Sequence, residues 1–297
     1  FLAQETDFPF EIIIHDDAST DSTAEIIAGY QRLYPQIIKP IYQKQNQYST
    51  GKRIAISFVF PKAEGEYIAF CEADDYWVDP HKLQKQAEFL RDNPDFSTCF
   101  GRAAVLRKNE LLPDEHKQNY RAILGDRTEF GLEDVLQENF IATCAVMFRK
   151  KKFAGFPAWS EKLPFGDWVL HLLNAQQGKI KYFDDLMAVY RVHPGGTWTS
   201  KSLKEKYQGI FLFYHLVSQH LNHKYDDIIL RAIEKIGLTY IEYSDQLQEA
   251  KEWLAGQLEQ TWEQLGQTQG QLGQTQGQLE QTWEQLRQTQ VQLVQTR

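Results

Sequence analysis

Short apolar segments alternate with amphipathic segments along the first half of the chain. Residues 9–15, 38–43 and 66–71 are apolar and rich in Ile, Tyr and Phe, which is typical of buried strands. Residues 20–34 and 79–93 carry apolar side chains at helical spacing. Strands that alternate with helices favour a parallel sheet with helices on both faces. The pattern therefore predicts an α/β fold with a mostly parallel sheet flanked by helices.

The second half of the chain is less regular. Strand-like segments at 96–106, 140–150 and 179–193 can extend or flank the same sheet. Residues 201–256 have helical patterning rich in aromatic side chains and are expected to cover the core. We predict a main domain over residues 1–200, followed by this helical region.

The C-terminal segment, residues 257–297, has a different composition, with 15 Gln among 41 residues. Leu recurs every seven residues from Leu258 to Leu293, and Thr follows each Leu three positions later. A sustained seven-residue period predicts a coiled coil. Thr is a poor seam residue, and each Gly in the repeat costs about 1 kcal/mol of helix propensity relative to Ala. We expect a marginal helix that is stabilised by self-association or by another partner.

Composition narrows the classes of function. The net charge is −8, so nothing in the composition predicts a basic surface suited to nucleic acid. No apolar stretch approaches the roughly 20 residues of a transmembrane helix. Cys71, Cys99 and Cys144 lie in apolar segments without metal-ligand spacing, which predicts buried free thiols. We expect a cytoplasmic protein, with peripheral attachment to the inner face of the membrane as an alternative.

Three carboxylates follow the apolar segment 66–71 directly: Glu72, Asp74 and Asp75. Ligands of α/β sheets bind beyond the carboxyl ends of the strands, so these side chains lie where a site is expected. Clustered acids repel one another unless a cation joins them, and hard oxygen ligands suit Mg²⁺ or Mn²⁺. The competing interpretation is a solvated acidic turn at the start of the next helix.

Other acidic residues stand at the ends of predicted elements. Asp16 and Asp17 follow the first apolar segment and would meet the later acids if the two strands are neighbours in a parallel sheet. Asp167 begins an apolar helix, where a capping acid is the simplest interpretation. Lys52 and Arg53 can pair with phosphate, but an exposed basic loop is the simpler expectation.

Two motifs together resemble those of the family 2 glycosyltransferases, which have the Rossmann-like GT-A fold. They are DDASTDST, residues 16–23, and EADDYWVDP, residues 72–80. The resemblance covers roughly residues 1–200. It implies an inverting enzyme that depends on a nucleotide-sugar donor, most simply a UDP-sugar, and on Mn²⁺ or Mg²⁺. The first strand of the family, with its nucleotide-binding loop, has no counterpart here, so we expect an N-terminally truncated domain.

The resemblance also implies roles for individual residues. Asp17 resembles the acid that contacts the nucleotide base, Asp74 the acid near the ribose, and Asp75 the direct metal ligand. Glu72 replaces the first Asp of the family's D-x-D motif, so we include it among the metal ligands. Three further residues of the two motifs are assigned to the nucleotide site: Asp16, Ser19 and Trp77.

Asp167, in FGDWVL, resembles the catalytic base of the family. The segment YRVHPGGTWTS, residues 190–200, resembles a loop that closes over the donor. On this basis His193 is a candidate metal ligand, with a structural histidine as the alternative. We expect the base to deprotonate an acceptor hydroxyl as its oxygen attacks the anomeric carbon.

The leading hypothesis is therefore a metal-dependent inverting glycosyltransferase, of the hexosyltransferase type, that acts in the synthesis of cell-surface polysaccharide or glycan. Its expected partners are a nucleotide sugar and a glycan or lipid-linked acceptor. A nucleotidyltransferase remains open because it also holds Mg²⁺ on a nucleotide with acids at a sheet edge. A glycoside hydrolase requires carboxylates that face each other across a sugar. The remaining alternative is a coiled-coil interaction protein with a non-catalytic nucleotide-sugar-binding domain.

Overall fold

The computed structural model describes residues 1–153, 155–245, 248, 252, 267, 270–271, 273–279 and 281. Contacts divide the chain into two compact units, Phe1–Glu234 and Lys235–Arg297. The predicted domain boundaries after residues 200 and 256 stay predictions. Most of the predicted coiled-coil tail, 257–297, lies outside the described residues, so self-association also stays a prediction.

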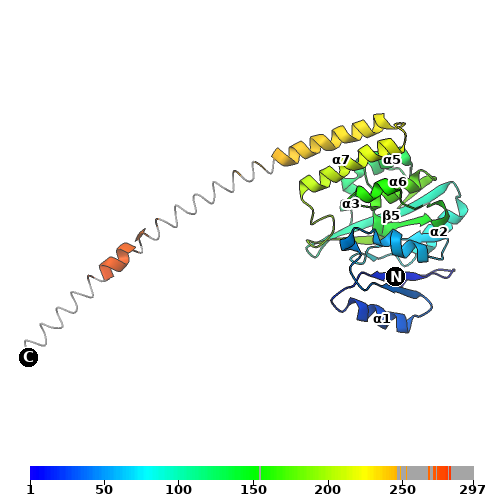
Figure 1. Cartoon of the computed structure of the whole chain (residues 1–297), viewed down its shortest axis with the longest axis horizontal. Coiled ribbons are helices and arrows are strands. Elements are labelled where there is room, and N and C mark those ends of the chain that lie inside the picture. Colours follow the sequence, from blue (N-terminus) through cyan, green and yellow to red (C-terminus); the bar gives the residue numbers. More distant parts are fainter. Residues whose placement is uncertain are drawn as a thin grey trace, which may run out of the picture. The chain divides into compact units, whose positions relative to one another are not determined.

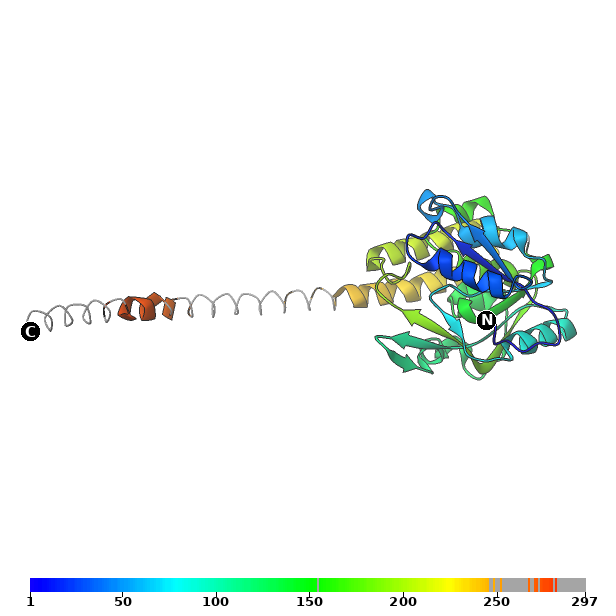
Figure 2. The same ribbon diagram turned by 90° about the horizontal axis from the view of Figure 1, so that it is seen from below.

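The elements of the first unit are shown in Figure 1 and, after a 90° turn, in Figure 2. The strands are β1 Ile12–Asp16, β2 Ile38–Tyr42, β3 Tyr67–Ala69, β4 Tyr76–Trp77, β5 Phe96–Arg107, β6 Glu110–Leu112, β7 Glu129–Phe130, β8 Val146–Arg149 and β9 Lys179–Val192. The α-helices are α1 Thr23–Leu33, α2 Lys82–Asp92, α3 Glu115–Asn119, α4 Arg121–Leu124, α5 Leu132–Gln137, α6 Asp167–Ala175 and α7 Leu203–His220. Short helical turns are η1 Tyr48–Thr50, η2 Ala55–Val59, η3 Phe60–Lys62, η4 Thr143–Ala145, η5 Lys150–Lys152 and η6 Ala158–Lys162. Residues 226–245 are also helical.

The larger sheet is mixed. Its strand order is β3-β8-β5-β9-β4, with β6 beside β5 and β7 beside β9. Only the β5–β9 pair is parallel in this sheet; the other pairs are antiparallel. The α/β prediction is confirmed, but the expectation of a mostly parallel sheet is wrong. One reason is local: Lys108 and Asn109 have φ of 49° and 67°, the left-handed pair that closes a tight hairpin and makes β6 antiparallel to β5.

The first two strands form a separate parallel pair, joined by α1. The prediction that β1 and β3 are neighbours in one sheet is therefore wrong, because β1 pairs only with β2 and β3 only with β8. A cavity of about 670 Å³ lies between these strands and is lined from both by apolar side chains such as Ile14 and Ile68. In Figure 1, α1 and this small sheet lie on the opposite side of β5 from α5, α6 and α7.

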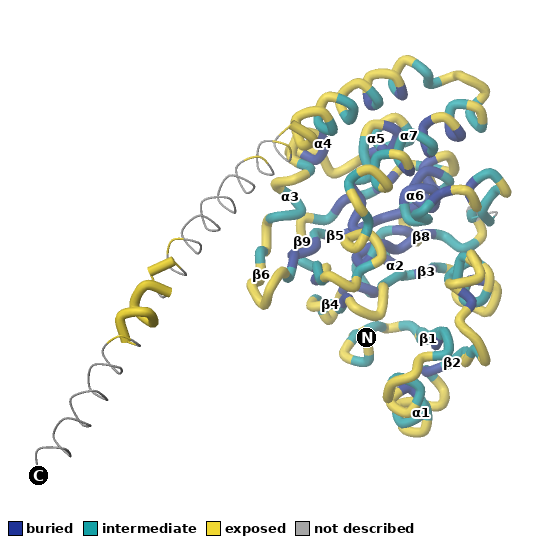
Figure 3. The backbone as a smooth tube through the Cα atoms, turned by 60° about the vertical axis from the view of Figure 1, so that its left-hand side comes forward, coloured by how far each residue is buried: buried dark blue, intermediate teal, exposed yellow. Residues whose placement is uncertain are grey.

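The core of the unit is centred on β5 and β8. Figure 3 shows both strands and α6 as largely buried, and Phe100 and Phe148 are fully enclosed. Leu90 of α2 packs with Cys99 of β5, whereas the Ser97 hydroxyl donates to the Asn174 carbonyl of α6. The two helices are thereby fixed on the sheet that carries the acidic residues. Cys99 and Cys144 are buried free thiols as predicted, while Cys71 is half-buried.

Helix α7 is attached to the main domain by aromatic packing. Trp168 of α6 stacks on Phe213 with ring centroids 4.4 Å apart, and the Tyr214 hydroxyl donates to the Gln137 carbonyl at 3.2 Å. The expectation that the helical region covers the core is confirmed for this helix. None of the described helices combines the length and the apolar content needed to cross a membrane.

Candidate functional site

The acidic segment forms a turn between β3 and β4. The Asp75 amide donates to the Glu72 carbonyl at 3.1 Å, which closes the turn. Asp75 is buried, and its Oδ1 accepts the backbone N–H of Arg191 at 2.8 Å. Because Arg191 belongs to β9, the central sheet holds this carboxylate in place. Asp75 is therefore not solvated, whereas Glu72 and Asp74 of the same turn are exposed.

Four carboxylates share one electrostatic environment. Glu72 lies at the surface, yet desolvation by its surroundings, followed by the charges of Asp75, Asp167 and Asp74, raises its pKa to about 8. Desolvation also raises the pKa of Asp75 to about 6, and the charge of Asp74 adds to this. Asp167 therefore interacts electrostatically with Glu72 of the acidic turn. Ionising all four groups is unfavourable without a compensating positive charge.

Asp167 is the first residue of α6, where its charge is favoured by the helix dipole. Its Oδ2 accepts a hydrogen bond from Asn139 Nδ2 at 3.0 Å. Asp167 also interacts electrostatically with Tyr120 and Tyr190, whose pKa values burial raises to about 12. The candidate base thus has one defined hydrogen-bond donor, Asn139, and two tyrosines within electrostatic reach.

The first acidic motif forms a separate loop. The Ser19 amide donates to Asp16 Oδ1 at 3.4 Å, and Asp16 is buried at the end of β1. Asp17 accepts the amides of Gln47 and Tyr48 at 2.8 and 2.9 Å, one on each carboxylate oxygen. These contacts tie the first motif to the loop after β2. The roles predicted for these residues in binding a nucleotide stay predictions.

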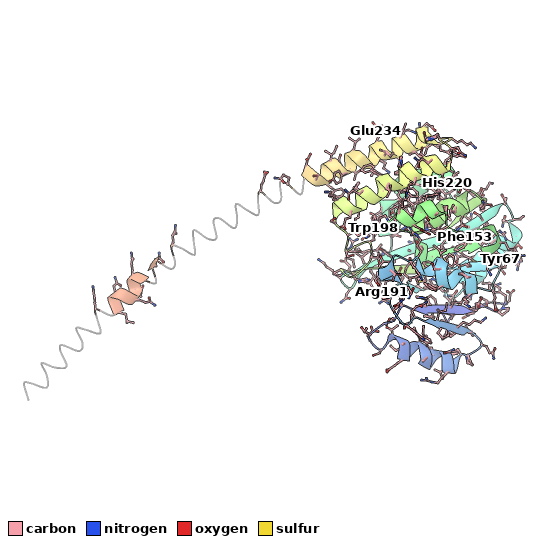
Figure 4. The ribbon with its side chains drawn as sticks, in the orientation of Figure 1. Tyr67, Phe153, Arg191, Trp198, His220 and Glu234 are labelled. Atoms are coloured by element: carbon pink, nitrogen blue, oxygen red, sulfur yellow. The ribbon has the colours of Figure 1, made fainter. Side chains whose placement is uncertain are left out.

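The loop after β9 reaches the acidic turn through His193. Its Nε2 lies 2.9 Å from Asp74 Oδ2, and both side chains are partly exposed. Further along this loop Trp198 contacts Phe165, with ring centroids 5.9 Å apart. Figure 4 labels Arg191 and Trp198 on the same side of the domain. The structure thus joins the predicted closing loop to the acids, while a metal-binding role of His193 stays a prediction.

Trp77 lies beneath the acidic turn and packs in the core. Its indole N–H donates to the Cys144 carbonyl at 2.7 Å, and Lys82 Nζ lies 4.3 Å from the centre of the ring. The N–H and one face of Trp77 are therefore already engaged. The contact of Trp77 with a nucleotide stays a prediction. In the structure, Trp77 supports the turn.

The residues present fit a divalent cation in their chemistry. Among the described residues, no three His, Cys, Asp or Glu side chains converge on a common metal position. Glu72 and Asp75 nevertheless supply hard oxygen donors, whose pKa values are raised first by desolvation and then by neighbouring negative charges. Mg²⁺ is usually held by one or two carboxylates together with substrate phosphates rather than by a complete protein cage. This donor set suits that arrangement.

Two residues of the site were not identified correctly from the sequence. Asn139 was missed, because an Asn ahead of a strand carries no signal for a partner 28 residues later. Arg53 was expected in an exposed basic loop, and this is wrong. Its guanidinium is partly buried and donates to the carbonyls of Phe165, Leu163 and Ser160. Only the folded chain brings these distant segments together.

Comparison with known proteins agrees with this geometry. The model of glycosyl transferase family 2 matches residues 1–154. An uncharacterised protein of Mycobacterium bovis is 39% identical over 201 residues, which are 67% of this chain and 55% of that protein. The Escherichia coli UDP-Glc:alpha-D-GlcNAc-diphosphoundecaprenol beta-1,3-glucosyltransferase WfaP is 38% identical over 86 residues, which are 29% of this chain and 32% of that enzyme.

A solved structure supports the fold. Residues 1–349 of Staphylococcus aureus TarS, crystallised with UDP, match with a TM-score of 0.50 and 19% identity over 73% of this chain and 59% of that chain. The chain spans about half the length of the mycobacterial relative. The family match covers more than half of the chain and includes both acidic motifs. On these grounds, the chain belongs to glycosyl transferase family 2, with the GT-A fold.

Proposed function

We propose that this protein transfers a sugar from a UDP-sugar to a hydroxyl group of a cell-surface glycan or its lipid-linked precursor, with inversion at the anomeric carbon and with Mn²⁺ or Mg²⁺. Family membership supports glycosyl transfer over nucleotidyl transfer. UDP in the TarS structure and the UDP-glucose donor and lipid diphosphate acceptor named for the E. coli relative support the substrate classes. Such an acceptor would place the reaction at the cytoplasmic face of the membrane.

The observation that carries the proposal is the grouping of Asp167 with the acidic turn. Glu72 interacts electrostatically with Asp75, Asp167 and Asp74, which supports a site in which the four carboxylates serve one substrate. A sugar nucleotide needs a positive charge at its diphosphate and a base near its anomeric carbon. The acidic turn can supply the positive charge by binding a cation, and Asp167 can supply the base.

The donor would bind through both acidic motifs. Asp17 and Asp74 would accept hydrogen bonds from the base and the ribose, and Asp75, with Glu72, would hold the divalent cation. When bound, that cation supplies Lewis-acid stabilisation of the departing diphosphate. The closing loop would cover the donor, because His193 already contacts Asp74 at its edge. Exclusion of water there favours transfer over hydrolysis of the donor.

Asp167 would accept the proton of the acceptor hydroxyl as its oxygen forms the new bond to the anomeric carbon. The bond between that carbon and the diphosphate oxygen breaks in the same displacement, and the electron pair leaves with UDP. Attack from the face opposite the diphosphate inverts the configuration. Asn139 donates to Asp167 Oδ2, which leaves Oδ1 free to receive the proton.

The test is a transfer assay on the purified protein with a panel of UDP-sugars, Mn²⁺, and a GlcNAc-diphosphate-lipid acceptor. We expect one donor to yield UDP and a product of inverted configuration, established by NMR. Asp75→Asn should lose this activity by at least about 10²-fold, because the leaving diphosphate is no longer neutralised. Asp185→Asn, which removes an exposed carboxylate paired with Lys85, is the control and should retain it.

Other outcomes would contradict the proposal. Release of pyrophosphate, with the nucleoside monophosphate attached to the acceptor, would instead establish a nucleotidyltransferase. Retention of configuration would exclude the single displacement. Failure to bind any UDP-sugar in calorimetry, with Mn²⁺ present and the protein folded, would favour the interaction-protein alternative.

A further inference from the structure

Arg53 connects two segments that the proposed function assigns to different substrates. It follows η1 and the loop whose amides of Gln47 and Tyr48 bind both oxygens of Asp17. Its side chain extends to the segment 160–166, directly ahead of Asp167. Hydrogen bonds and the intervening chain thus connect the candidate nucleotide acid to the backbone just ahead of the candidate base.

The guanidinium group is held by backbone carbonyls rather than by a carboxylate. Its Nη1 donates to Phe165 O at 2.8 Å, and its Nη2 donates to Leu163 O at 3.0 Å and to Ser160 O. Only a planar guanidinium presents several donors in a fixed fork, so Lys cannot reproduce this set. Hydrogen bonds from a charged donor are stronger than neutral ones, which favours a defined position for the segment.

The contact also reaches the residue next to the candidate base. A Cβ atom at Gly166 would lie 2.7 Å from Arg53 Nη1, so the guanidinium packs directly against this glycine. Gly166 is the N-cap of α6, and Asp167 is its first residue. Arg53 and Asp167 also interact electrostatically. A shift of Arg53 would therefore move the start of α6 and with it the carboxylate.

We propose that Arg53 is a positioning residue that couples the loop at Asp17 to the segment that places Asp167, so that donor binding fixes the position of the base. This inference rests on the proposed function. Binding of a nucleotide at Asp17 changes the contacts of residues 47 and 48, and Arg53, five residues further on, transmits that change to residues 160–166. The base would be held in its reactive position when the donor is bound.

Arg149 offers a matched control. Its guanidinium also donates to three backbone carbonyls, those of Phe96, Asn93 and Leu90. These carbonyls belong to α2, its C-terminal end and β5, and none belongs to the acidic turn or to the segment before α6. Arg149→Lys should therefore lower stability for the same reason as Arg53→Lys without acting on the base.

The experiment compares backbone amide exchange by mass spectrometry in the wild type, Arg53→Lys and Arg149→Lys, with and without UDP and Mn²⁺. In the wild type, UDP should slow exchange in residues 46–53 and in residues 160–170. In Arg53→Lys, protection of the first segment should remain and that of the second should be lost. Transfer should also slow by about 10²-fold, as for a misplaced catalytic group, with UDP affinity unchanged. At temperatures below its lowered Tm, Arg149→Lys should show the wild-type pattern of amide exchange and the wild-type rate of transfer.

The results distinguish a failure of the proposed coupling from a failure of the proposed function. Equal protection of residues 160–170 in the wild type and Arg53→Lys, or equal rates in the two lysine variants, would overturn the coupling while leaving the glycosyltransferase assignment intact. UDP binding without any protection of residues 160–170 in the wild type would do the same. Absence of UDP binding by the folded wild type would overturn the proposed function, and the coupling with it.

Discussion

Replacing Asp167 with Asn is expected to lower kcat for sugar transfer by about 10³-fold, which lies within the range measured for loss of a general base. An amide cannot take the proton from the acceptor hydroxyl. The substitution conserves size, and the amide oxygen can still accept the hydrogen bond that Asn139 donates to Asp167. The start of α6 should therefore be preserved, and the KM for the donor should change little. Initial rates of UDP release across donor concentrations measure both quantities.

Glu161→Gln is the matched control for this variant. Glu161 is also an acid that interacts electrostatically with Arg53, but it lies in η6 and is exposed. The control should keep the wild-type kcat. If Asp167→Asn retained more than a tenth of the activity, or if its loss were matched by a large rise in donor KM, Asp167 would not be the base.

Without divalent cations, Glu72 should make the free energy of unfolding fall, relative to that of Glu72→Gln, as the pH rises from about 6.5 to about 8. The pKa of Glu72 is raised from its ordinary value of 4.5 to about 8. Between these values the folded state holds a proton that the unfolded state has lost, so stability decreases with increasing pH. Thermal unfolding in a chelator across this pH range measures the slope. Mn²⁺ should stabilise the protein more at pH 8 than at pH 6.5, because at pH 6.5 Mn²⁺ competes with the proton on Glu72.

Comparison with Glu72→Gln separates Glu72 from other groups with shifted pKa values. Burial lowers the pKa of His116 and His171 to about 4 and that of Lys82 to about 8, so the contributions of these groups increase with pH, opposite in sign to that of Glu72. The pKa of Asp75, about 6, lies below the range. Glu72→Gln should remove the downward contribution, and Glu110→Gln, at an exposed position of β6, should keep the wild-type slope. A slope that persists unchanged in Glu72→Gln would exclude Glu72 as its source.

Much of the fold could be predicted from local patterns. The predicted helices at 20–34 and 79–93 correspond to α1 and α2, and the strand-like segments at 96–106 and 179–193 correspond to β5 and β9. These segments have strong periodicity and bury one face or both, so local pattern and tertiary environment agree. Strand partners were not predictable in the same way, because pairing depends on which edges remain free after the chain has turned.

The residues of the candidate site also differ in whether the sequence alone could identify them. The acids of the turn were identifiable because three carboxylates after a buried strand are costly without a function. Asp167 was recognisable only by resemblance, since an acid at a helix start is ordinary. Arg53 and Asn139 were not identifiable in their roles, because each acts on a segment far along the chain.

The sequence by itself determined the α/β class, the elements that carry the acids, and the family of the chain, because these depend on periodicity and on residue types at short spacing. Only the tertiary structure decided that the large sheet is mixed, that β1 and β3 are not partners of each other, and that Asp167 interacts electrostatically with the acidic turn. It also decided the raised pKa values of Glu72 and Asp75 and the hydrogen bonds from Arg53 to backbone carbonyls. These properties depend on desolvation and on contacts between distant segments, which exist only after the chain has folded.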